Sequence, residues 1–176
     1  QLVFGSDNYI SGANNGVPVP IIPIPGTTTR ELYVSINGSD SNTGNALYPF
    51  QTIQQAIDTV TGFGDATVST QYKILVAGGT YNENISLIPF INILSLSGDE
   101  TSVFFTGIMD PSGLDIPQAT FTISNFIFSQ NPVWNISGFG NASYIRFIEC
   151  EFTTGSNMDI TQNNISIIAF IGCTIE

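Results

Sequence analysis

Three stretches near the C-terminal end of the chain repeat one apolar pattern at a nearly constant spacing. They are Phe121-x-Ile123-x-x-Phe126-x-Phe128, Ile145-x-Phe147-x-x-Cys150-x-Phe152 and Ile168-x-Phe170-x-x-Cys173-x-Ile175, offset by 24 and then 23 residues. Within each stretch the apolar side chains alternate as on one face of a strand, and the double gap marks a bend where the alternation changes phase. This period is too short for two helices and their turns. The pattern therefore predicts β-coils stacked as parallel rungs, each covering the apolar face of the one before.

The repeat also predicts which side chains stack on one another. Aligning the three stretches gives four inward columns: Phe121/Ile145/Ile168, Ile123/Phe147/Phe170, Phe126/Cys150/Cys173 and Phe128/Phe152/Ile175. The two cysteines share a column, so a disulfide between them is sterically conceivable. A stacked pair of buried free thiols is favoured instead, because cysteine behaves as a small apolar residue in protein cores.

Length and charge limit the classes of partner. A chain of 176 residues with 42% apolar residues fits one domain with ample core. Only Arg30, Lys73 and Arg146 oppose 14 acidic residues, and the formal net charge is -11. With so few cations to neutralise phosphates, nucleic acid and anionic membranes are unfavourable partners. No apolar run is long enough for a membrane span, so we expect no membrane insertion. No basic-then-apolar leader precedes Gln1, so we expect any signal peptide to have been removed or never present.

The low charged fraction of 10% leaves the surface to Asn, Ser, Thr, Gln and Gly. Such a surface suits a protein on a virion surface or an extracellular protein better than a cytosolic enzyme. Histidine is absent and only two cysteines occur, which excludes zinc or haem sites of the ordinary type. We therefore expect no cofactor.

Residues 1–30 differ in composition from the rest and predict an extended arm preceding a β-helix domain over residues 31–176. Continuation of this domain past Glu176 and capping by a partner are both open alternatives. Asn- and Gly-rich stretches lead into an apolar run over residues 17–26 that is broken by prolines. Proline removes ladder donors and favours an extended, polyproline-like path. One interpretation is a disordered leader. An ordered arm that docks on a neighbouring chain is favoured, because its apolar side chains would otherwise lie in water.

Coarse secondary structure follows from the pattern over residues 32–118. A strand over 32–36 precedes turn-forming residues 37–44, and a short amphipathic helix is predicted near residues 52–61. Thr52 and Gln55 form its capping box, and its apolar face is Ile53, Ala56, Ile57 and Val60. Further strands are predicted at 73–77, 85–87, 91–93, 94–96 and 103–105, and a loop at 108–118.

Three motifs in this region carry a resemblance to a known superfamily. They are Tyr33-Val34-Ser35-x-Asn37-Gly38-Ser39-Asp40-Ser41-Asn42-Thr43-Gly44, Tyr48-Pro49-Phe50-Gln51-Thr52-Ile53-Gln54-Gln55-Ala56-Ile57 and Ile74-x-Val76-Ala77-x-Gly79-Thr80-Tyr81-x-Glu83. Together they resemble the opening of right-handed parallel β-helix proteins of the pectate-lyase-like superfamily. The resemblance implies an all-β fold, a right-handed parallel β-helix solenoid whose N-terminal mouth is capped by the helix. That superfamily holds polysaccharide lyases, hydrolases and esterases, but also phage tailspikes, virion surface proteins and adhesins, so the fold alone selects no activity.

The catalytic patterns that the resemblance implies are not matched. Lyases of this fold use a basic residue beside acids that hold calcium, and the one cation expected on a rung is Arg146. It is expected to point outward and to pair with Glu149 and Glu151 on the same rung, which makes it a poor proton acceptor. The acid and histidine cluster of the hydrolases is absent, and the esterase pattern has no counterpart. We therefore predict no catalytic residue.

Weaker site candidates remain. Glu149, Glu151 and Asp159 are compatible with a calcium site, although a solvated acidic edge is favoured, so no metal site is predicted. Trp134 and Phe139 are candidates for a stacking platform under a sugar, and a loop aromatic folded back over the rung is an equal alternative. Five Asn-x-Ser sequons are candidate glycosylation sites if the chain follows a secretory route: Asn37, Asn84, Asn135, Asn141 and Asn164.

Two functions compete on these features. The first is a structural or attachment module displayed on a virion or cell surface, assembled through its N-terminal arm and an open terminal rung into a homo-oligomer or a larger complex. The alternative is a polysaccharide-processing enzyme or a glycan-binding domain of the pectate-lyase-like type. The missing basic and histidine residues favour the first. An enzyme groove would need several acids and a cation on one outward sheet, whereas a structural module would show polar ladders there.

Overall fold

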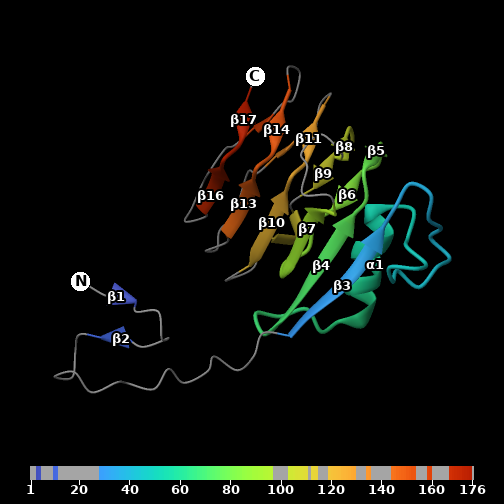
Figure 1. Ribbon diagram of the computed structural model, residues 1–176, viewed down its shortest axis with the longest axis horizontal. Helices are drawn as coiled ribbons and strands as arrows, with labels where there is room; N and C mark the ends of the chain where they lie inside the picture. Colours follow the sequence, from blue (N-terminus) through green and yellow to red (C-terminus); the bar gives the residue numbers. More distant parts are fainter. Residues whose placement is uncertain are drawn as a thin grey trace.

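The structure, a computed structural model, is built mainly of parallel β-sheets, and its described residues include one α-helix, α1 (Figure 1). It describes residues 28–96, 103–110, 112–114, 119–129, 144–153 and 167–175, together with strand positions 3–4, 10–11, 134–135 and 158–159. The predicted all-β class is confirmed at this level. No helix in the described part has the length and apolar content that a membrane crossing requires.

Two large sheets contain most of the strands. The six-stranded sheet has the order β16-β13-β10-β7-β4-β3 and the five-stranded sheet the order β17-β14-β11-β8-β5, and every pairing within them is parallel. The bounds of the first set are β3 Thr28–Val34, β4 Thr70–Val76, β7 Ile91–Ser95, β10 Thr120–Ser124, β13 Tyr144–Ile148 and β16 Ile167–Ile171. Those of the second are β5 Gly79–Tyr81, β8 Val103–Phe105, β11 Ile127–Phe128, β14 Glu151–Phe152 and β17 Thr174–Ile175.

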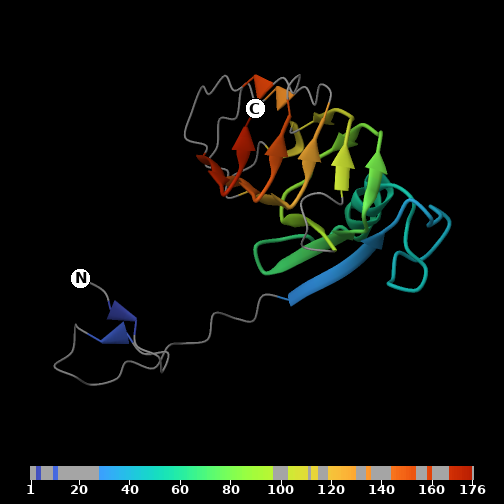
Figure 2. The same cartoon turned by 45° about the horizontal axis from the view of Figure 1, so that its top comes forward.

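Short strands contribute a further set of pairs. β6 (Ile85–Ser86) pairs with β9 (Met109–Asp110), and β12 (Trp134–Asn135) pairs with β15 (Met158–Asp159), both in parallel. Near the N-terminus, β1 (Val3–Phe4) and β2 (Ile10–Ser11) form an antiparallel pair. The chain thus visits the six-stranded sheet, the five-stranded sheet and a short pair in turn, as β7-β8-β9, β10-β11-β12 and β13-β14-β15 (Figure 2).

The strand register confirms three of the predicted columns directly. Paired positions are Phe121, Ile145 and Ile168, then Ile123, Phe147 and Phe170, and then Phe128, Phe152 and Ile175. Aromatic rings stack along these columns, with centroids 4.9 Å apart for Phe128 and Phe152 and 5.1 Å apart for Phe147 and Phe170. Offset ring stacks add to the free energy gained from burying their area.

The double gap in each repeat corresponds to a left-handed residue. Asn125, Glu149 and Gly172 have φ of 58°, 53° and 66°, and they lie one repeat apart. A left-handed residue turns the chain sharply between two strands, and only Gly or Asn adopts it at little cost. The amide of each bend also joins the next unit, since Asn125 N–H donates to the Ile148 carbonyl and Glu149 N–H to the Ile171 carbonyl.

The fourth column follows each bend. The Glu151 amide donates to the Phe126 carbonyl and the Thr174 amide to the Cys150 carbonyl. Phe126, Cys150 and Cys173, which precede β11, β14 and β17, are therefore aligned from one unit to the next. Both cysteines are free thiols, as predicted, and Cys150 is buried while Cys173 is half-buried. Desolvation raises the pKa of the Cys150 thiol to about 12, so this side chain stays neutral at physiological pH.

Helix α1 (Ile53–Phe63) packs beside the start of the stack and contacts β3, β4 and β6 (Figure 1). Its buried face is the predicted set of Ile53, Ala56, Ile57 and Val60. Thr52 caps it by accepting the Gln55 amide through its hydroxyl, as the capping box predicts. Gly64, with φ of 66°, ends the helix and donates its N–H to the Val60 carbonyl.

Three sequence predictions in this part were wrong. The first strand begins at Thr28 rather than Leu32, because β3 pairs along its whole length with β4, so Arg30 belongs to the sheet and not to the arm. The predicted loop 108–118 contains β9 and the short 3-10 helix Ser112–Leu114, since β9 pairs in register with β6. The predicted inward pair Leu94 and Leu96 does not form, because Ile91, Ile93 and Ser95 are the buried residues of β7 and Leu96 is 48% exposed.

The inward columns generate a first prediction. Phe147→Asp is expected to destabilise the protein by about 4 kcal/mol or more, because it places a charge in a fully buried stack. Arg146→Asp, at the neighbouring exposed position, is the matched control and is expected to change the free energy of unfolding by about 0.5 kcal/mol or less. Urea unfolding followed by circular dichroism measures both. Equal effects would show that Phe147 does not belong to the core.

Two glycines generate a second prediction. A Cβ on Gly107 would lie 1.5 Å from the Glu83 carbonyl oxygen, whereas a Cβ on Gly62, on the exposed side of α1, would meet nothing within 4 Å. Gly107→Ala is therefore expected to lower the melting temperature strongly. Gly62→Ala is expected to stabilise by about 0.5–1 kcal/mol through helix propensity. Tolerance of alanine at Gly107 would contradict the close contact between the β8–β9 turn and the segment after β5.

Candidate functional site

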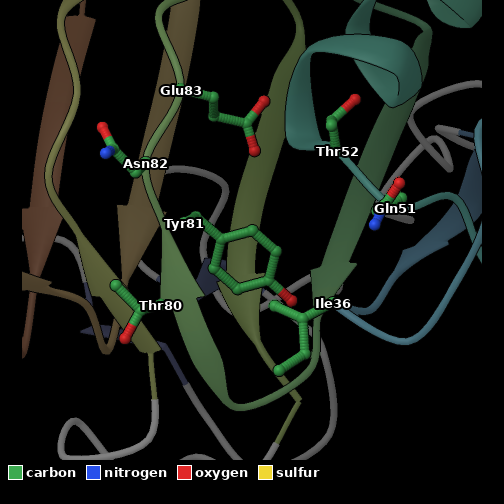
Figure 3. A pocket seen from close by; sticks show the side chains of 7 residues that line it. All are labelled: Ile36, Gln51, Thr52, Thr80, Tyr81, Asn82 and Glu83. Carbon is green, nitrogen blue, oxygen red and sulfur yellow. The ribbon is translucent and has the colours of Figure 1, made fainter.

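The motifs that carry the superfamily resemblance converge on the first turn of α1. Asp40 comes from the loop after β3, Thr52 directly precedes α1, and Glu83 follows β5. Figure 3 shows the Glu83 carboxylate pointing toward the start of the helix. The first N–H groups of a helix have no partner within it and carry partial positive charge, so this position attracts carboxylates.

Glu83 bonds to the helix with both carboxylate oxygens. Its Oε1 accepts the Ile53 amide and its Oε2 the Gln54 amide, each at 2.9 Å. Burial raises the pKa of Glu83 above its ordinary value, and the charge of Asp40 adds to this, while the two amides act in the opposite direction. The carboxylate is thus a half-buried acceptor whose two oxygens both accept backbone N–H groups.

Asp40 binds the residues just before the helix. Its Oδ1 accepts the Gln51 and Thr52 amides at 2.8 and 2.9 Å, and its Oδ2 accepts the Thr52 hydroxyl at 3.0 Å. The side chain therefore fixes the chain direction at the point where α1 begins. Between them, Asp40, Thr52 and Glu83 satisfy five consecutive amides from Gln51 to Gln55.

The glycines of the first motif have a packing role beside this clamp. A Cβ on Gly38 would lie 2.4 Å from the Phe50 carbonyl oxygen, and one on Gly44 would lie 2.1 Å from the Phe50 ring. Gly44 also has φ of 73°. The loop can close over Phe50 only because both positions lack a side chain. Phe50 itself is 3% exposed and belongs to the core.

A shallow hollow of about 250 Å³ lies beside the clamp (Figure 3). Its lining residues are Ile36, Gln51, Thr52, Thr80, Tyr81, Asn82 and Glu83. The Tyr81 hydroxyl donates to the Ala77 carbonyl at 2.8 Å, and desolvation raises the pKa of Tyr81 to about 12. The lining holds no cation or thiol, and its one carboxylate is engaged by the helix. The Glu83 carboxylate therefore serves as a cap for the first amides of α1.

An enzyme groove on this fold would need acids and a cation on one outward sheet face, so the outward residues of the six-stranded sheet were compared with that requirement. The strand register aligns Glu31, Lys73, Asn92, Thr122, Arg146 and Ala169 across it. Three strand spacings, about 14 Å, separate Lys73 from Arg146. The row contains one acid and, between the two cations, only an amide and a hydroxyl. It is closer to a polar ladder than to a cluster of acids around a cation.

Arg146 lies where the sequence places it, on the exposed face of β13. The expected ion pairs with Glu149 and Glu151 are wrong: within the described part of the chain, the ion pair found joins Arg30 to Asp65. Glu149 turns away because it occupies the left-handed bend, and Glu151 belongs to the other sheet. A bend between the two sheets separates charges that are close in sequence.

The other predicted site residues are only partly placed. Asn37 and Asn84 are exposed, although the Asn84 side-chain oxygen accepts the Ile108 amide at 2.9 Å. Trp134 and Asn135 form β12, opposite Met158 and Asp159. The sugar-contact candidate Phe139 and the sequons Asn141 and Asn164 lie outside the described residues. The calcium alternative has no support among the described residues, which contain no group of three potential metal ligands.

One polar cluster was not foreseen from the sequence. Arg30 Nη1 donates to the Tyr72 hydroxyl at 2.8 Å and lies 2.6 Å from an Asp65 carboxylate oxygen, while the Tyr72 hydroxyl donates to Asp65 at 2.5 Å. The cluster joins the start of β3 to the connection between α1 and β4. Tyr72 and Asp65 lie 42 and 35 positions after Arg30 in the chain. At such separations no local sequence pattern could have identified the cluster.

The clamp generates a third prediction. Glu83→Gln is expected to destabilise by about 1–2 kcal/mol at neutral pH, because its amide nitrogen would face a backbone N–H that needs an acceptor. The pKa of Glu83 is raised in the folded state, so the folded protein binds this proton more tightly than the unfolded chain. Wild-type stability relative to the variant should therefore rise as the pH falls from the raised pKa toward the ordinary 4.5.

Urea unfolding of both proteins between pH 4 and 7 provides the measurement. Glu151→Gln, on the outer face of β14, is the control and is expected to change stability by about 0.5 kcal/mol or less. If the difference in the free energy of unfolding between wild type and Glu83→Gln shrinks as the pH falls, desolvation is not the dominant influence on the pKa of Glu83.

Comparison with known proteins supports family membership and nothing finer. No curated protein and no solved structure matches the chain with significant similarity. A family model described as "Protein of unknown function (DUF1565)" matches residues 36–126, which is more than half of the chain and includes the clamp residues Asp40, Thr52 and Glu83. The chain therefore belongs to the DUF1565 family.

Proposed function

We propose that this protein is a right-handed parallel β-helix of the pectate-lyase-like type that serves as a non-catalytic structural or attachment module. The observation that carries the fold is the regular return of the chain to the same two sheets, with inward columns in register over successive units. The DUF1565 match and the capping position of α1 agree with this assignment. All pairings among the described strands from β3 onward are parallel, as rungs of one coil require.

The non-catalytic role is supported by where the polar groups lie. The motif carboxylates Asp40 and Glu83 are engaged by backbone amides at the helix start. The row across the outer face of the six-stranded sheet has a single acid, Glu31, and two widely separated cations. Lyase or hydrolase chemistry on a sugar needs an acid or a metal next to a base at one bond. Neither the motif carboxylates Asp40 and Glu83 nor this row offers such a pair among the described residues.

The module is displayed on a virion or cell surface and functions as a homo-oligomer or as part of a larger assembly. A charged fraction of only 10% agrees with an exterior that consists largely of uncharged polar residues. The exposed apolar residues of the last described unit, Phe170, Ile171 and Ile175, provide a surface for contact with another protein.

Light scattering on the intact protein is the fourth test, with a mass of at least two chains as the expected result. Antibodies against the module should label intact particles or cells without permeabilisation. A stable monomer at micromolar concentration, together with labelling only after permeabilisation, would count against a displayed, assembling module.

Glycan recognition is the second candidate, favoured by the exposed Tyr144 beside Arg146 on one strand. An array of acidic and neutral polysaccharides would detect binding, and release of reducing or unsaturated ends would detect cleavage. The structural role predicts no cleavage. Cleavage that Arg146→Ala abolishes while the circular dichroism spectrum is unchanged would move the protein to the enzyme class.

A further inference from the structure

The outer face of the six-stranded sheet carries an apolar row beside the polar one (Figure 1). On β3, β4, β7, β10 and β13 the strand register gives this row as Tyr33, Leu75, Leu94, Ser124 and Ile148. The residue before each of them is buried in the core, so these side chains point outward. Four of the five positions therefore place a large apolar or aromatic side chain outside the core.

This row keeps surface that water can reach. Its four large members are half-buried, whereas the inward residues beside them on the same strands are buried. The row crosses four strand spacings, about 19 Å, without a charged member. A contiguous apolar stripe on a sheet face that is otherwise polar is typical of a contact with another protein.

The neighbouring row supplies the charges of this face. Among the outward residues of the strands from β3 to β13, the charged ones are Glu31, Lys73 and Arg146. Glu31 lies next to Lys73 in the register. Arg146 is four strands away from Glu31, and it has no acidic residue within ion-pair distance in the described part of the chain. The face thus has an acid near one side and a cation without an acidic partner near the other.

These charges limit how a second copy packs on the face. In a two-fold dimer with the two sheets face to face, the axis lies between the sheets and runs either across the strands or along them. An axis across the strands puts each strand opposite its own copy, which brings Glu31, Lys73 and Arg146 toward like charges. An axis along the strands reverses the strand order and keeps each row opposite itself.

The position of an axis along the strands decides which charges meet. Midway between β7 and β10, it places Lys73 opposite Arg146 of the second copy, so two cations face each other twice. Over β7, it places β3 opposite β13, so Glu31 faces Arg146 twice and Lys73 faces a neutral residue, Thr122. Opposite charges then meet while five strands of each copy overlap.

The same register also matches the apolar row. Tyr33 then faces Ile148, and Leu75 faces Ser124, the one small residue of the row. Leu94 lies on the axis and faces its own copy. Each copy therefore offers a gap where the other has a leucine, and the contact removes the apolar surface of both rows from water.

We propose that the outer face of the six-stranded sheet binds a second copy of this chain in a two-fold dimer whose axis runs along β7. Glu31 of each copy pairs with Arg146 of the other, and the two apolar rows pack together. Sheets about 10 Å apart leave room for these two long side chains to meet. The proposal rests on the homo-oligomeric assembly of the proposed function and names its surface and register.

Charge exchange at this pair tests the register by light scattering over a concentration series. Glu31→Lys and Arg146→Glu are each expected to raise the dimer dissociation constant about 100-fold, because like charges then meet twice. Mixed in equal amounts, the two variants should dimerise with a dissociation constant within about threefold of wild type, since every pair again joins opposite charges. Glu151→Lys, on the other sheet, is the matched control for Glu31→Lys and should leave the constant unchanged.

Three results would overturn the proposal. A wild-type oligomer that keeps its affinity in both single variants assembles through another surface, and the proposed function then stands without this face. Weakened dimers that mixing does not restore would show that Glu31 and Arg146 do not face each other. A monomeric wild type would refute both the dimer and the assembling module.

Leu94 offers a second test that does not depend on the ion pair. Leu94→Asp places two carboxylates against each other on the axis and is expected to raise the dimer dissociation constant about 100-fold, with an unchanged circular dichroism spectrum. Phe104→Asp, at an exposed apolar residue on the outer face of β8, is the control and should leave the dimer intact. A dimer that tolerates Leu94→Asp as well as it tolerates Phe104→Asp would contradict packing through this row.

Discussion

In-register stacking of inward apolar side chains is the interaction on which the rest of this structure depends. A two- or three-residue strand such as β11 or β14 cannot bury a face alone, and it forms only because the units before and after it present matching side chains and backbone groups. The left-handed residues at Asn125, Glu149 and Gly172 keep this match by turning the chain at the same point in each unit. Where no described unit follows, at Phe170 and Ile175, the same columns become exposed apolar surface.

The beginning of the stack uses a different device. Helix α1 packs an apolar face against β3 and β4. The Glu83 carboxylate holds its first turn, and the Asp40 carboxylate, from a separate loop, holds the two residues just before it. Partial burial of Glu83 disfavours its charged form and raises its pKa, and two backbone amides offset part of this effect. The most recognisable motifs of the chain are therefore explained by closure of one end of the fold. A motif of acids and glycines in such a family does not by itself indicate a catalytic centre.

The first and last described units of the stack differ. The first is covered by helix α1, whereas in the last the column residues Phe170 and Ile175 are exposed. On the outer face of the six-stranded sheet, the row of paired residues has Glu31, Lys73 and Arg146 as its charged members, and Lys73 and Arg146 lie three strand spacings apart.

The sequence by itself determined the repeat, the columns, the bend positions and the helix, because each depends on residues within one unit or on a fixed offset between units. Phe121, Ile145 and Ile168 could be aligned from spacing alone, and Thr52 from its local capping pattern. Only the tertiary structure decided the pairing of β3 over Thr28–Val34, the strand at Met109, and the clamp that brings Asp40 and Glu83 to one helix terminus. It also separated Arg146 from Glu149 and Glu151, which sequence proximity had suggested as partners. In each of these cases the deciding contact joins backbone or charges from different elements, and a linear pattern carries no information on how sharply the chain bends between them.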